Sequence, residues 1–405
     1  MKNIIKYSVL SLLAVAGVSC ESFLNEKVVS GVSYDYLETK TGIETAVNGV
    51  YSTMRWYVGG ERYYCLTEYG VDYVWEGADG GNKDAFNKYS NQLNSSFGML
   101  YEFWENAFKG ITRANTALMY LPEVGDMTDA EKVSREGELR FMRAYFYFEK
   151  VKRFGDVPWY DKVLGSDDAD LYKARDSREF VMGKIMEDLN FAIEVFKETN
   201  RTKELYRVTW WTAQALKSRV GLFEGTYRKY HGLGDYEKYL NDCVSASNEI
   251  MTASGGYSLY QSGSQSYRNL FKSENAIDAE IILARDYNND LSLVHKVQAF
   301  ENSPTLGRPG LSKKLVNYYL MKNGNRFTDQ PNYATMEFKD EIVNRDPRLA
   351  QTIRTSNINM NVTMTGYHLL KYANDNMSYT GDSSNDLPLF RLAEVYLNYA
   401  EAKAE

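Results

Sequence analysis

Long stretches of this 405-residue sequence repeat apolar residues every three or four positions, the spacing that places them on one face of an α-helix. We expect helices over residues 41–54, 100–121, 128–154, 176–196, 209–227 and 236–252. The stretch 139–148 is apolar on nearly all sides, so it should be buried between neighbouring helices. Paired amphipathic helices joined by short polar turns predict a mainly α fold of degenerate tetratricopeptide-like hairpins.

Local signals indicate where these helices begin and end. Thr41 and Thr128 are each followed three residues later by Glu, the pattern of a capping box at a helix N-terminus. Gly155 follows the third helix, as is common at a helix C-terminus. The residues expected in the core include Phe180, Ile185, Leu189, Ile193 and Phe196 of the fourth helix, and also Trp104, Trp210 and Trp211.

The sequence changes character in its second half. Between residues 255 and 388 the helical pattern weakens and Gly, Asn, Ser and Asp rise, while the apolar run 280–284 predicts a strand. Regular helix is expected again over 389–405. We therefore expect a tetratricopeptide-like region over 40–254 and a loop-rich region over 255–405, together in one compact unit. The last helix stops without a cap, a Gly or a polar tail, so we interpret the chain as incomplete at its C-terminus.

The chain begins with a short cationic stretch and an apolar run too short to span a bilayer, and small residues precede Cys20. This pattern predicts a secretory signal peptide over residues 1–19 that is removed on export. Cys20 would then carry a lipid anchor, with the polar residues 20–39 as a tether. The alternative is a soluble exported protein with an incidental cysteine, because Gly17 stands where lipid-attachment signals most often have Leu.

Composition argues against several classes of function. The formal net charge is −7 and no basic patch is available for a phosphate backbone, so we expect no nucleic-acid partner. His231, His295 and His368 are scattered without metal-ligand spacing, and no phosphate-binding or nucleophile motif occurs. We therefore expect no metal, no cofactor and no catalysis. Cys65 and Cys243 could pair in an oxidising compartment, but we favour two buried free thiols.

Two segments contain the residue types of a sugar-binding site, which needs an aromatic ring for the apolar sugar face and polar groups for the hydroxyls. The first segment contains Tyr73, Trp75 and Asn82, and Tyr73 and Trp75 share a face if the chain is extended. The second segment offers Tyr287, Asn288, Phe300 and Arg308. For Trp75, a position in the core is the alternative.

Six short motifs occur in the order found in one family of surface lipoproteins. They are Cys20-Glu21-Ser22-Phe23-Leu24, the segments ITRAN at 111–115, LRFMRAY at 139–145, RFGDVP at 153–158 and RDPRL at 345–349, and the helix 389–402. Together they resemble the SusD/RagB family. The resemblance implies a scaffold of tetratricopeptide-like units whose loops hold the ligand site, anchored in the outer membrane of a Gram-negative bacterium. It also implies capture of glycans, or peptides in some branches, for release into a TonB-dependent porin of the SusC type.

The signature residues themselves are interpreted as structural. Arg153, Phe154, Gly155, Asp156 and Pro158 are expected to form a helix stop and a turn held by Arg–Asp contacts. Arg391 is expected to pair with Glu394, three residues further along the last helix.

The leading hypothesis is therefore a surface-anchored protein of polysaccharide utilisation, which binds an oligomeric nutrient without converting it. Two alternatives remain. One is a secreted helical adaptor that binds only protein through its concave face. The other is a glycan-cleaving lipoprotein in which two carboxylates meet across a cleft.

Overall fold

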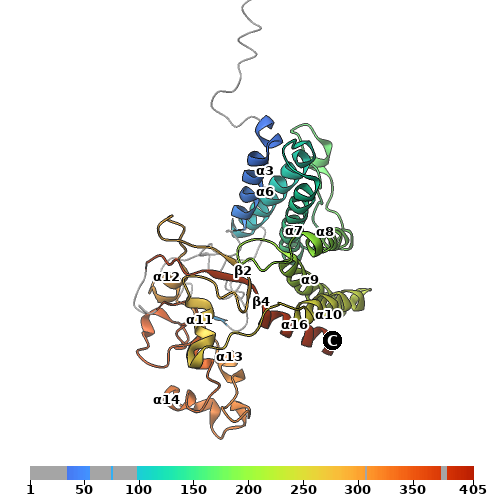
Figure 1. The fold of residues 1–405 in the computed structure, drawn as a ribbon. Coiled ribbons are helices and arrows are strands. Elements are labelled where there is room, and N and C mark those ends of the chain that lie inside the picture. Colours follow the sequence, from blue (N-terminus) through green and yellow to red (C-terminus); the bar gives the residue numbers. More distant parts are fainter. Residues whose placement is uncertain (1–33, 55–73, 76–97, 306–307, 375–380) are drawn as a thin grey trace, which may run out of the picture.

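The computed structural model describes residues 34–54, 74–75, 98–305, 308–374 and 381–405. The predicted signal peptide, Cys20 and most of the predicted tether lie outside these residues. Figure 1 shows a stack of long helices on one side of the molecule and a lobe of short helices, strands and loops on the other. The expected mainly α fold with tetratricopeptide-like hairpins is confirmed.

The helical stack is built from the long helices of the chain. They are α3 (Lys40–Thr53), α6 (Gly98–Tyr120), α7 (Asp129–Phe154), α8 (Arg178–Thr199), α9 (Trp210–Tyr230), α10 (Tyr236–Thr252) and α16 (Leu392–Ala404). The short turn η1 (Tyr34–Glu38) precedes α3, and η3 (Leu121–Glu123) and η4 (Ala169–Tyr172) lie between the later helices. Each helix from α3 to α10 packs on the next one, and α16 returns from the far end of the chain to pack on α9 and α10. None of the described helices has the length and apolar content needed to cross a bilayer.

The helix ends follow local capping chemistry. The N-cap of α3 is Thr39, whose hydroxyl accepts a backbone N–H of the first turn, so the predicted capping box at Thr41 is wrong. The capping box of α7 is confirmed, because the Thr128 hydroxyl accepts the Glu131 N–H and the Glu131 carboxylate accepts the Thr128 N–H. Gly155 ends α7 with a φ of 69°, in the left-handed region that favours glycine.

Helix α7 lies in the centre of the stack and is buried on nearly all sides, as its apolar sequence predicts. Residues 137–139 and 141–151 are all buried. Each large apolar side chain that is fully buried contributes about 1.5–3 kcal/mol relative to an exposed one. The packing of α6 and α8 against α7 is therefore a main source of the stability of the stack.

The expected core positions are confirmed with one exception. Trp210 and Trp211 are 2% exposed, and Trp104 packs against the edge of the same core. Phe180 is 46% exposed, so its assignment to the core is wrong. It lies in the first turn of α8, where Ser177 caps the helix before the buried stripe begins. Cys243 is a buried free thiol, whereas Cys65 lies outside the described residues.

The loop-rich lobe contains the elements between α10 and α16, together with β1 (Val74–Trp75). These elements are η5 (Gly263–Gln265), α11 (Ser266–Lys272), β2 (Ile281–Arg285), α12 (Val297–Asn302), β3 (Gly310–Leu311), α13 (Lys313–Tyr318), η6 (Phe327–Asp329), η7 (Tyr333–Thr335), α14 (Phe338–Glu341), α15 (Leu349–Thr352), η8 (Met360–Val362) and β4 (Leu387–Arg391). The strand expected over 280–284 is confirmed as β2, which pairs antiparallel with β4. Residues 389–391 belong to β4, so the prediction that they begin the last helix is wrong.

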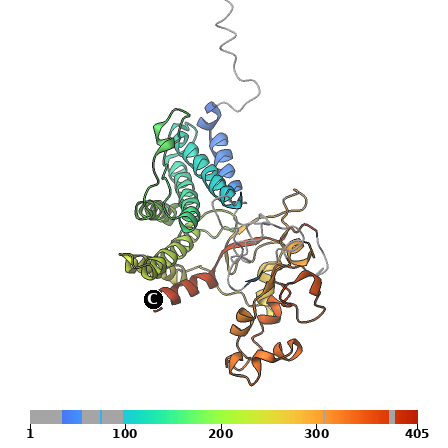
Figure 2. The same cartoon turned by 180° about the vertical axis from the view of Figure 1, so that it is seen from behind.

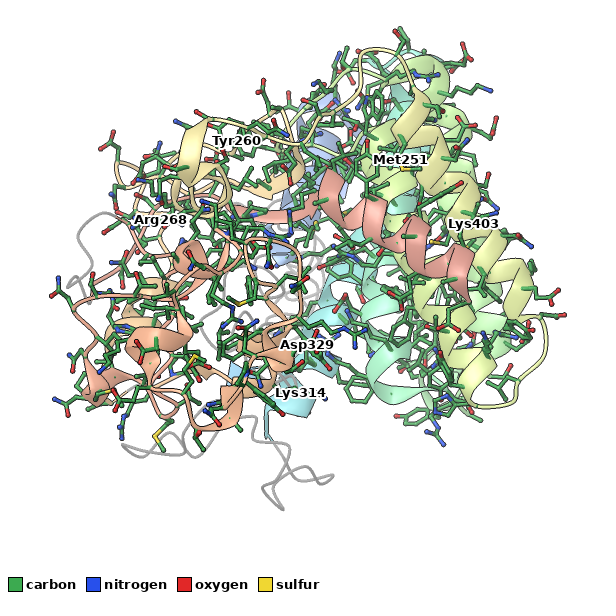
Figure 3. All side chains as sticks on the ribbon, turned by 90° about the horizontal axis from the view of Figure 1, so that it is seen from below. Met251, Tyr260, Arg268, Lys314, Asp329 and Lys403 are labelled. Atoms are coloured by element: carbon green, nitrogen blue, oxygen red, sulfur yellow. The ribbon has the colours of Figure 1, made fainter. Side chains whose placement is uncertain are left out.

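The segment that runs from β4 into α16 connects the lobe to the stack. Strand β4 pairs with β2 in the lobe, and α16 then lies along α10 (Figures 2 and 3). Arg219 of α9 holds the point where the strand becomes the helix. Its guanidinium donates to the two carboxylate oxygens of Glu394, at 2.6 and 2.7 Å, and to the carbonyl oxygen of Leu389 at 2.7 Å. It also lies 4.1 Å from the centre of the Phe390 ring.

Two further contacts fix the same junction. Arg391 donates to the carboxylate of Glu280 at 2.9 Å, so the predicted Arg391–Glu394 pair is wrong. Arg391 and Glu394 both hold the segment in place, Arg391 through Glu280 and Glu394 through Arg219. The buried carboxylate of Asp386 accepts the Tyr206 hydroxyl at 2.7 Å, and Tyr206 belongs to the connection between α8 and α9.

The signature turn after α7 is held differently from the expected Arg–Asp contact. Arg153 pairs with the Glu149 carboxylate one turn earlier in α7, and its guanidinium lies over the Phe103 ring. Asp156 instead accepts the backbone N–H of Arg178 at 2.8 Å, at the start of α8. Phe154 packs edge-on against Trp104, with the ring centres 5.1 Å apart, and Pro158 follows in the turn.

We expect Glu394→Gln to lower the free energy of unfolding by about 2 kcal/mol, because Gln removes the negative charge that Arg219 binds through two hydrogen bonds. Urea denaturation followed by circular dichroism measures the change. The control is Glu337→Gln, because Glu337 pairs with Lys339 on the surface, where both side chains are more than 70% exposed. Equal effects of the two substitutions would contradict the importance of the Arg219 contact.

Candidate functional site

Two segments that lie far apart in the sequence meet in a small antiparallel sheet. Strand β1 pairs with β3, with Val74 opposite Leu311 and Trp75 opposite Gly310. The first of these segments contains the predicted ligand residue Trp75, and the second begins two residues after Arg308. The fold therefore brings one end of each predicted ligand-binding segment to the same place.

A third segment completes this arrangement on the other side of β3. Gly310 forms a bridge with His368, and the Leu311 N–H donates to the Tyr367 carbonyl at 3.2 Å. The Met364 N–H donates to the carbonyl of Arg308 at 3.0 Å. We call residues 74–75, 308–311 and 363–368 the strand junction.

Gly310 is required by the close approach of these chains. A Cβ atom at this position would lie less than 3.0 Å from the hydroxyl oxygens of Thr363 and Thr365. Thr is β-branched and its χ1 is restricted, so moving these hydroxyl groups aside costs free energy. A glycine at position 310 therefore allows β3 to lie between its two neighbours.

Arg308 has an unusual backbone conformation at the edge of the junction. Its φ is 53°, in the left-handed region that non-glycine residues rarely adopt. The guanidinium contacts the Met360 carbonyl at 3.4 Å, and the side chain remains partly exposed. Strained positions of this kind tend to persist at binding and catalytic sites, because the surrounding structure holds them.

The other predicted ligand residues have different positions. Tyr287 is 5% exposed, and its ring packs against His295 with the centres 4.7 Å apart, so it is a core residue. Asn288 is exposed, and its side-chain oxygen accepts the N–H groups of Asp290 and Leu291 in its own turn. Neither residue belongs to the strand junction. Tyr73 and Asn82 lie outside the described residues, as do the side chains of Trp75 and Phe300.

A buried polar group that the sequence did not indicate lies behind the junction. The Asn302 side-chain oxygen accepts hydrogen bonds from His368 Nε2 at 3.1 Å and from the Arg354 guanidinium at 3.0 Å. The Arg354 N–H in turn donates to the His368 carbonyl at 2.8 Å. Burial, together with the positive charge of Arg354, lowers the pKa of His368 to about 4. His368 is therefore neutral at pH 7, and it helps to fix the segment that pairs with β3.

The described residues offer little for metal chemistry. No three His, Cys, Asp or Glu side chains in this part of the chain lie close enough together to hold a metal ion. His295 and His368 instead make hydrogen bonds within the lobe.

The fold, a helical stack with an irregular lobe inserted before its last helix, is similar to that of solved SusD-like proteins. A model described as "SusD family" matches residues 272–405, and one described as "Starch-binding associating with outer membrane" matches residues 22–222. The chain belongs to the SusD family.

Individual relatives agree with this assignment. The SusD-like protein P25 of Formosa agariphila is 22% identical over all of this chain and 78% of its own length. A SusD-like protein from Bacteroides fragilis has a similar structure, with a TM-score of 0.70, 22% identity, and coverage of 92% of this chain and 76% of that one. Surface glycan-binding protein A from Bacteroides thetaiotaomicron, solved with laminarihexaose, has a TM-score of 0.63 and 19% identity, and the match covers 90% of this chain and 79% of that one.

We expect Gly310→Ala to destabilise the protein by about 1–3 kcal/mol, because the added methyl group overlaps the two Thr hydroxyl groups. Thermal unfolding measures the effect. The matched control is Gly183→Ala in α8, where an added Cβ meets nothing within 4 Å. That substitution should raise stability by up to about 1 kcal/mol, because Ala is the better helix former. A neutral or stabilising Gly310→Ala would show that the segments do not approach as closely as described.

A pH dependence follows from His295, which is buried and neutral. Its Nδ1 accepts the Val297 N–H at 3.3 Å and its Nε2 donates to the Asn385 carbonyl at 2.9 Å. Burial lowers the pKa of His295 from 6.5 to about 4. The unfolded chain therefore binds a proton between these two pH values and the folded chain does not, so stability should fall as the pH falls from 6.5 to 4.

The His295→Asn variant should reduce this slope, because Asn can accept the Val297 N–H but does not titrate. His295 accounts for at most about 3 kcal/mol of the pH-dependent loss. Unfolding measured from pH 7 to pH 4 gives the slope for each variant. His231→Asn, at an exposed position, is the control. An unchanged slope in His295→Asn would show that the buried imidazole is not the group that titrates.

Proposed function

We propose that this protein captures an oligomeric glycan at the cell surface and delivers it to a TonB-dependent porin of the SusC type. The observation that carries the proposal is the pairing of Trp75 with Gly310, because Trp75 of the first predicted segment then lies beside the strand that begins two residues after Arg308, the end of the second. Trp75 would provide the ring face, and Arg308 would provide hydrogen-bond donors for sugar hydroxyl groups.

The family supports a carbohydrate as the ligand. One matching family model is described as starch-binding, and a structural relative was solved with laminarihexaose. The hydrogen-bonded backbone of the strand junction also suits a binding role. Interlocked segments such as β3 and the bridge to His368 position a site with little loss of conformational entropy when the ligand binds.

We further propose that the protein binds the glycan without cleaving it. Cleavage by a glycosidase would require two carboxyl groups about 5–10 Å apart on either side of the bound sugar. The described residues of the strand junction are Val74, Trp75, Arg308–Leu311 and Thr363–His368, and they include no Asp or Glu. Binding without turnover is therefore the expected behaviour.

The location at the membrane is proposed from the N-terminal sequence and the family. Removal of residues 1–19 would expose Cys20 for acylation, and residues 20–39 would connect the lipid to the folded body. The description of the family model as associating with the outer membrane agrees with this arrangement. A short tether would hold the binding protein beside a porin and raise its effective concentration there.

The mature chain should bind at least one polymer in a panel of laminarin, starch and xylan, measured by affinity electrophoresis and isothermal titration calorimetry, and release no product. Trp75→Ala should weaken binding about tenfold or more, which is about 1.4 kcal/mol, because the aromatic face is lost. Arg308→Ala should weaken it less.

The control is Tyr172→Ala, because Tyr172 is an aromatic residue that is 88% exposed on η4, in the helical stack. The Tyr172→Ala variant should bind the glycan with the affinity of the unmodified protein. Equal affinities for Trp75→Ala and Tyr172→Ala would overturn the proposed site. Binding of proteins but of no glycan would favour an adaptor, and the appearance of shorter sugars would favour a glycosidase.

A further inference from the structure

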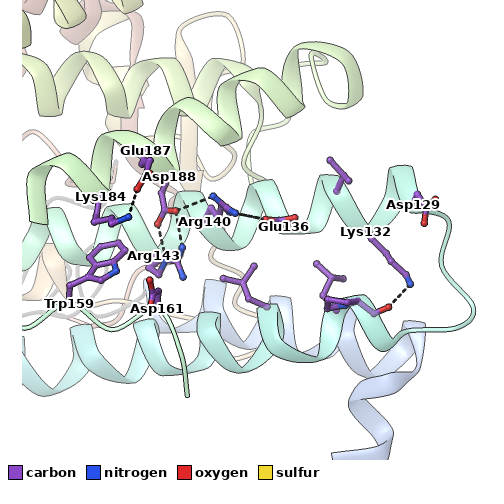
Figure 4. A pocket seen from close by; sticks show the side chains of 14 residues that line it. Asp129, Lys132, Glu136, Arg140, Arg143, Trp159, Asp161, Lys184, Glu187 and Asp188 are labelled. Carbon is purple, nitrogen blue, oxygen red and sulfur yellow. Dashed lines mark hydrogen bonds and ion pairs between the residues drawn. The ribbon is translucent and has the colours of Figure 1, made fainter. Parts of the chain in front are cut away.

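Two hollows of the molecule differ in whether their charged groups are already paired. A groove of about 660 Å³ lies along α7, next to α6 and α8 (Figure 4). In this groove Arg143 binds both oxygens of the Asp188 carboxylate at 2.8 Å. Lys184 pairs with Glu187 at 2.7 Å. Such pairs fix the walls of the groove and do not require a ligand.

A smaller pocket, of about 330 Å³, lies where the helical stack meets the loop-rich lobe. It is lined by residues of the second half of α3, by residues 283–286 of β2 and the position after it, and by Tyr206 and Arg207 from the connection between α8 and α9. We call it the inter-lobe pocket. Parts of the chain that are far apart in the sequence therefore surround one space.

Arg285, the last residue of β2, brings a positive charge into this pocket. Its side chain is partly buried and forms no hydrogen bond or ion pair within the described part of the chain. The Nε atom is fully covered, whereas the two terminal nitrogens keep accessible surface. A guanidinium is always charged, and a charge that is partly withdrawn from water without a partner is costly. An anionic group that reaches the terminal nitrogens would compensate it.

The second arginine of the pocket already has partners. Arg207 pairs with the Glu138 carboxylate at 2.9 Å and donates to the side-chain oxygen of Asn48 at 2.7 Å. This bond fixes the orientation of the Asn48 amide, so its NH₂ group is left to donate to a ligand. The positive charge that an anionic ligand would meet is therefore that of Arg285.

Asp286 adds an acceptor at the same place. It is exposed, and among the described residues it forms no hydrogen bond or ion pair, including none with Arg285. Burial, together with the negative charge of Asp286, raises the pKa of Asp386. Asp286 thus acts on a neighbouring carboxyl group of like charge, and its oxygens can accept hydrogen bonds from ligand hydroxyl groups.

We propose that the inter-lobe pocket binds a sugar residue that carries a carboxylate, such as a uronic acid. The carboxylate would pair with the terminal nitrogens of Arg285. Asp286 and the Asn48 amide would bind hydroxyl groups of the ring. Leu283 and Leu389 provide apolar lining for the ring itself.

Other small anions fit the pocket less well. A phosphate carries more negative charge than a carboxylate and would be repelled by Asp286. A free amino acid has its carboxylate and its ammonium on one carbon atom, so it would need Arg285 and Asp286 close together, and these two side chains do not pair. A uronic acid separates its carboxylate from its hydroxyl groups across the ring.

That the ligand is a glycan rests on the proposed function, but the residues involved are different. The inter-lobe pocket shares no described residue with the strand junction. An acidic residue in a longer glycan would therefore be recognised at a second point, and the two sites can be tested separately.

Binding of D-galacturonate and D-glucuronate to the mature protein, measured by saturation-transfer NMR and calorimetric titration, tests the proposal. At least one should bind, and its methyl ester and the matching neutral sugar should bind about tenfold more weakly or worse, because they lack the charge. Arg285→Gln should weaken binding about tenfold or more. Arg285→Lys should weaken it less, because Lys keeps the charge but loses the paired N–H groups.

The matched control is Arg175→Gln, because Arg175 is exposed, lies outside the pocket and also forms no hydrogen bond or ion pair within the described residues. It should bind the uronate normally. Arg285→Gln should unfold at the temperature of the unmodified protein, since the guanidinium has no internal hydrogen bond to lose. The proposal is overturned if neither uronate binds, if the methyl ester or acetate binds as tightly, or if Arg285→Gln binds as Arg175→Gln does.

Trp75→Ala separates this pocket from the strand junction. It should leave the binding of the monosaccharide uronate unchanged while it weakens the binding of a polymer. Neutral polymers that bind through Trp75 while no uronate binds would overturn the inter-lobe site and leave the proposed function standing. A uronate that binds through Arg285 while no polymer binds would do the reverse.

Discussion

The guanidinium group of Arg219 holds the point where the loop-rich lobe joins the helical stack. Arg219 binds Glu394, the carbonyl of Leu389 and the face of the Phe390 ring, so a single side chain holds the end of β4 and the start of α16. The strand belongs to the lobe and the helix belongs to the stack. Together with the Arg391–Glu280 and Tyr206–Asp386 contacts and the apolar core shared by both parts, this connection positions the loop-rich lobe on the stack. Hydrogen bonds between charged partners in a partly buried position are strong enough for this role.

Much of the scaffold could be predicted from the sequence because its determinants are local. The spacing of apolar residues by three or four positions predicts the long helices, and the predicted bounds of α10 are those of the structure. Errors arose where a distant partner decides the outcome. From their sequence alone, residues 389–391 are predicted to be helical. In the fold they belong to β4, which pairs with β2. Glu394 lies one helical turn from Arg391, yet each residue has a better placed partner on another element.

The candidate site was predictable only in part, for the same reason. Aromatic and polar residues among glycines indicated two segments, but not that Trp75 and Gly310 are paired, because strand pairing between distant residues leaves no periodic signal. Tyr287 is a residue type common in sugar-binding sites, but it is buried in the core. The group formed by Asn302, Arg354 and His368 has no motif at all, since its members come together only through the packing of the lobe.

The contacts that join the loop-rich lobe to the helical stack link residues far apart in the sequence, which affects how the chain folds. Arg219 and Glu394 are 175 residues apart, and Tyr206 and Asp386 are 180 residues apart. By contrast, α7 and α8, or α9 and α10, are neighbours along the chain and close only short loops. Local hairpins form quickly, whereas contacts that close long loops are entropically costly and slow. We therefore expect the helical hairpins to form before the loop-rich lobe reaches its final position.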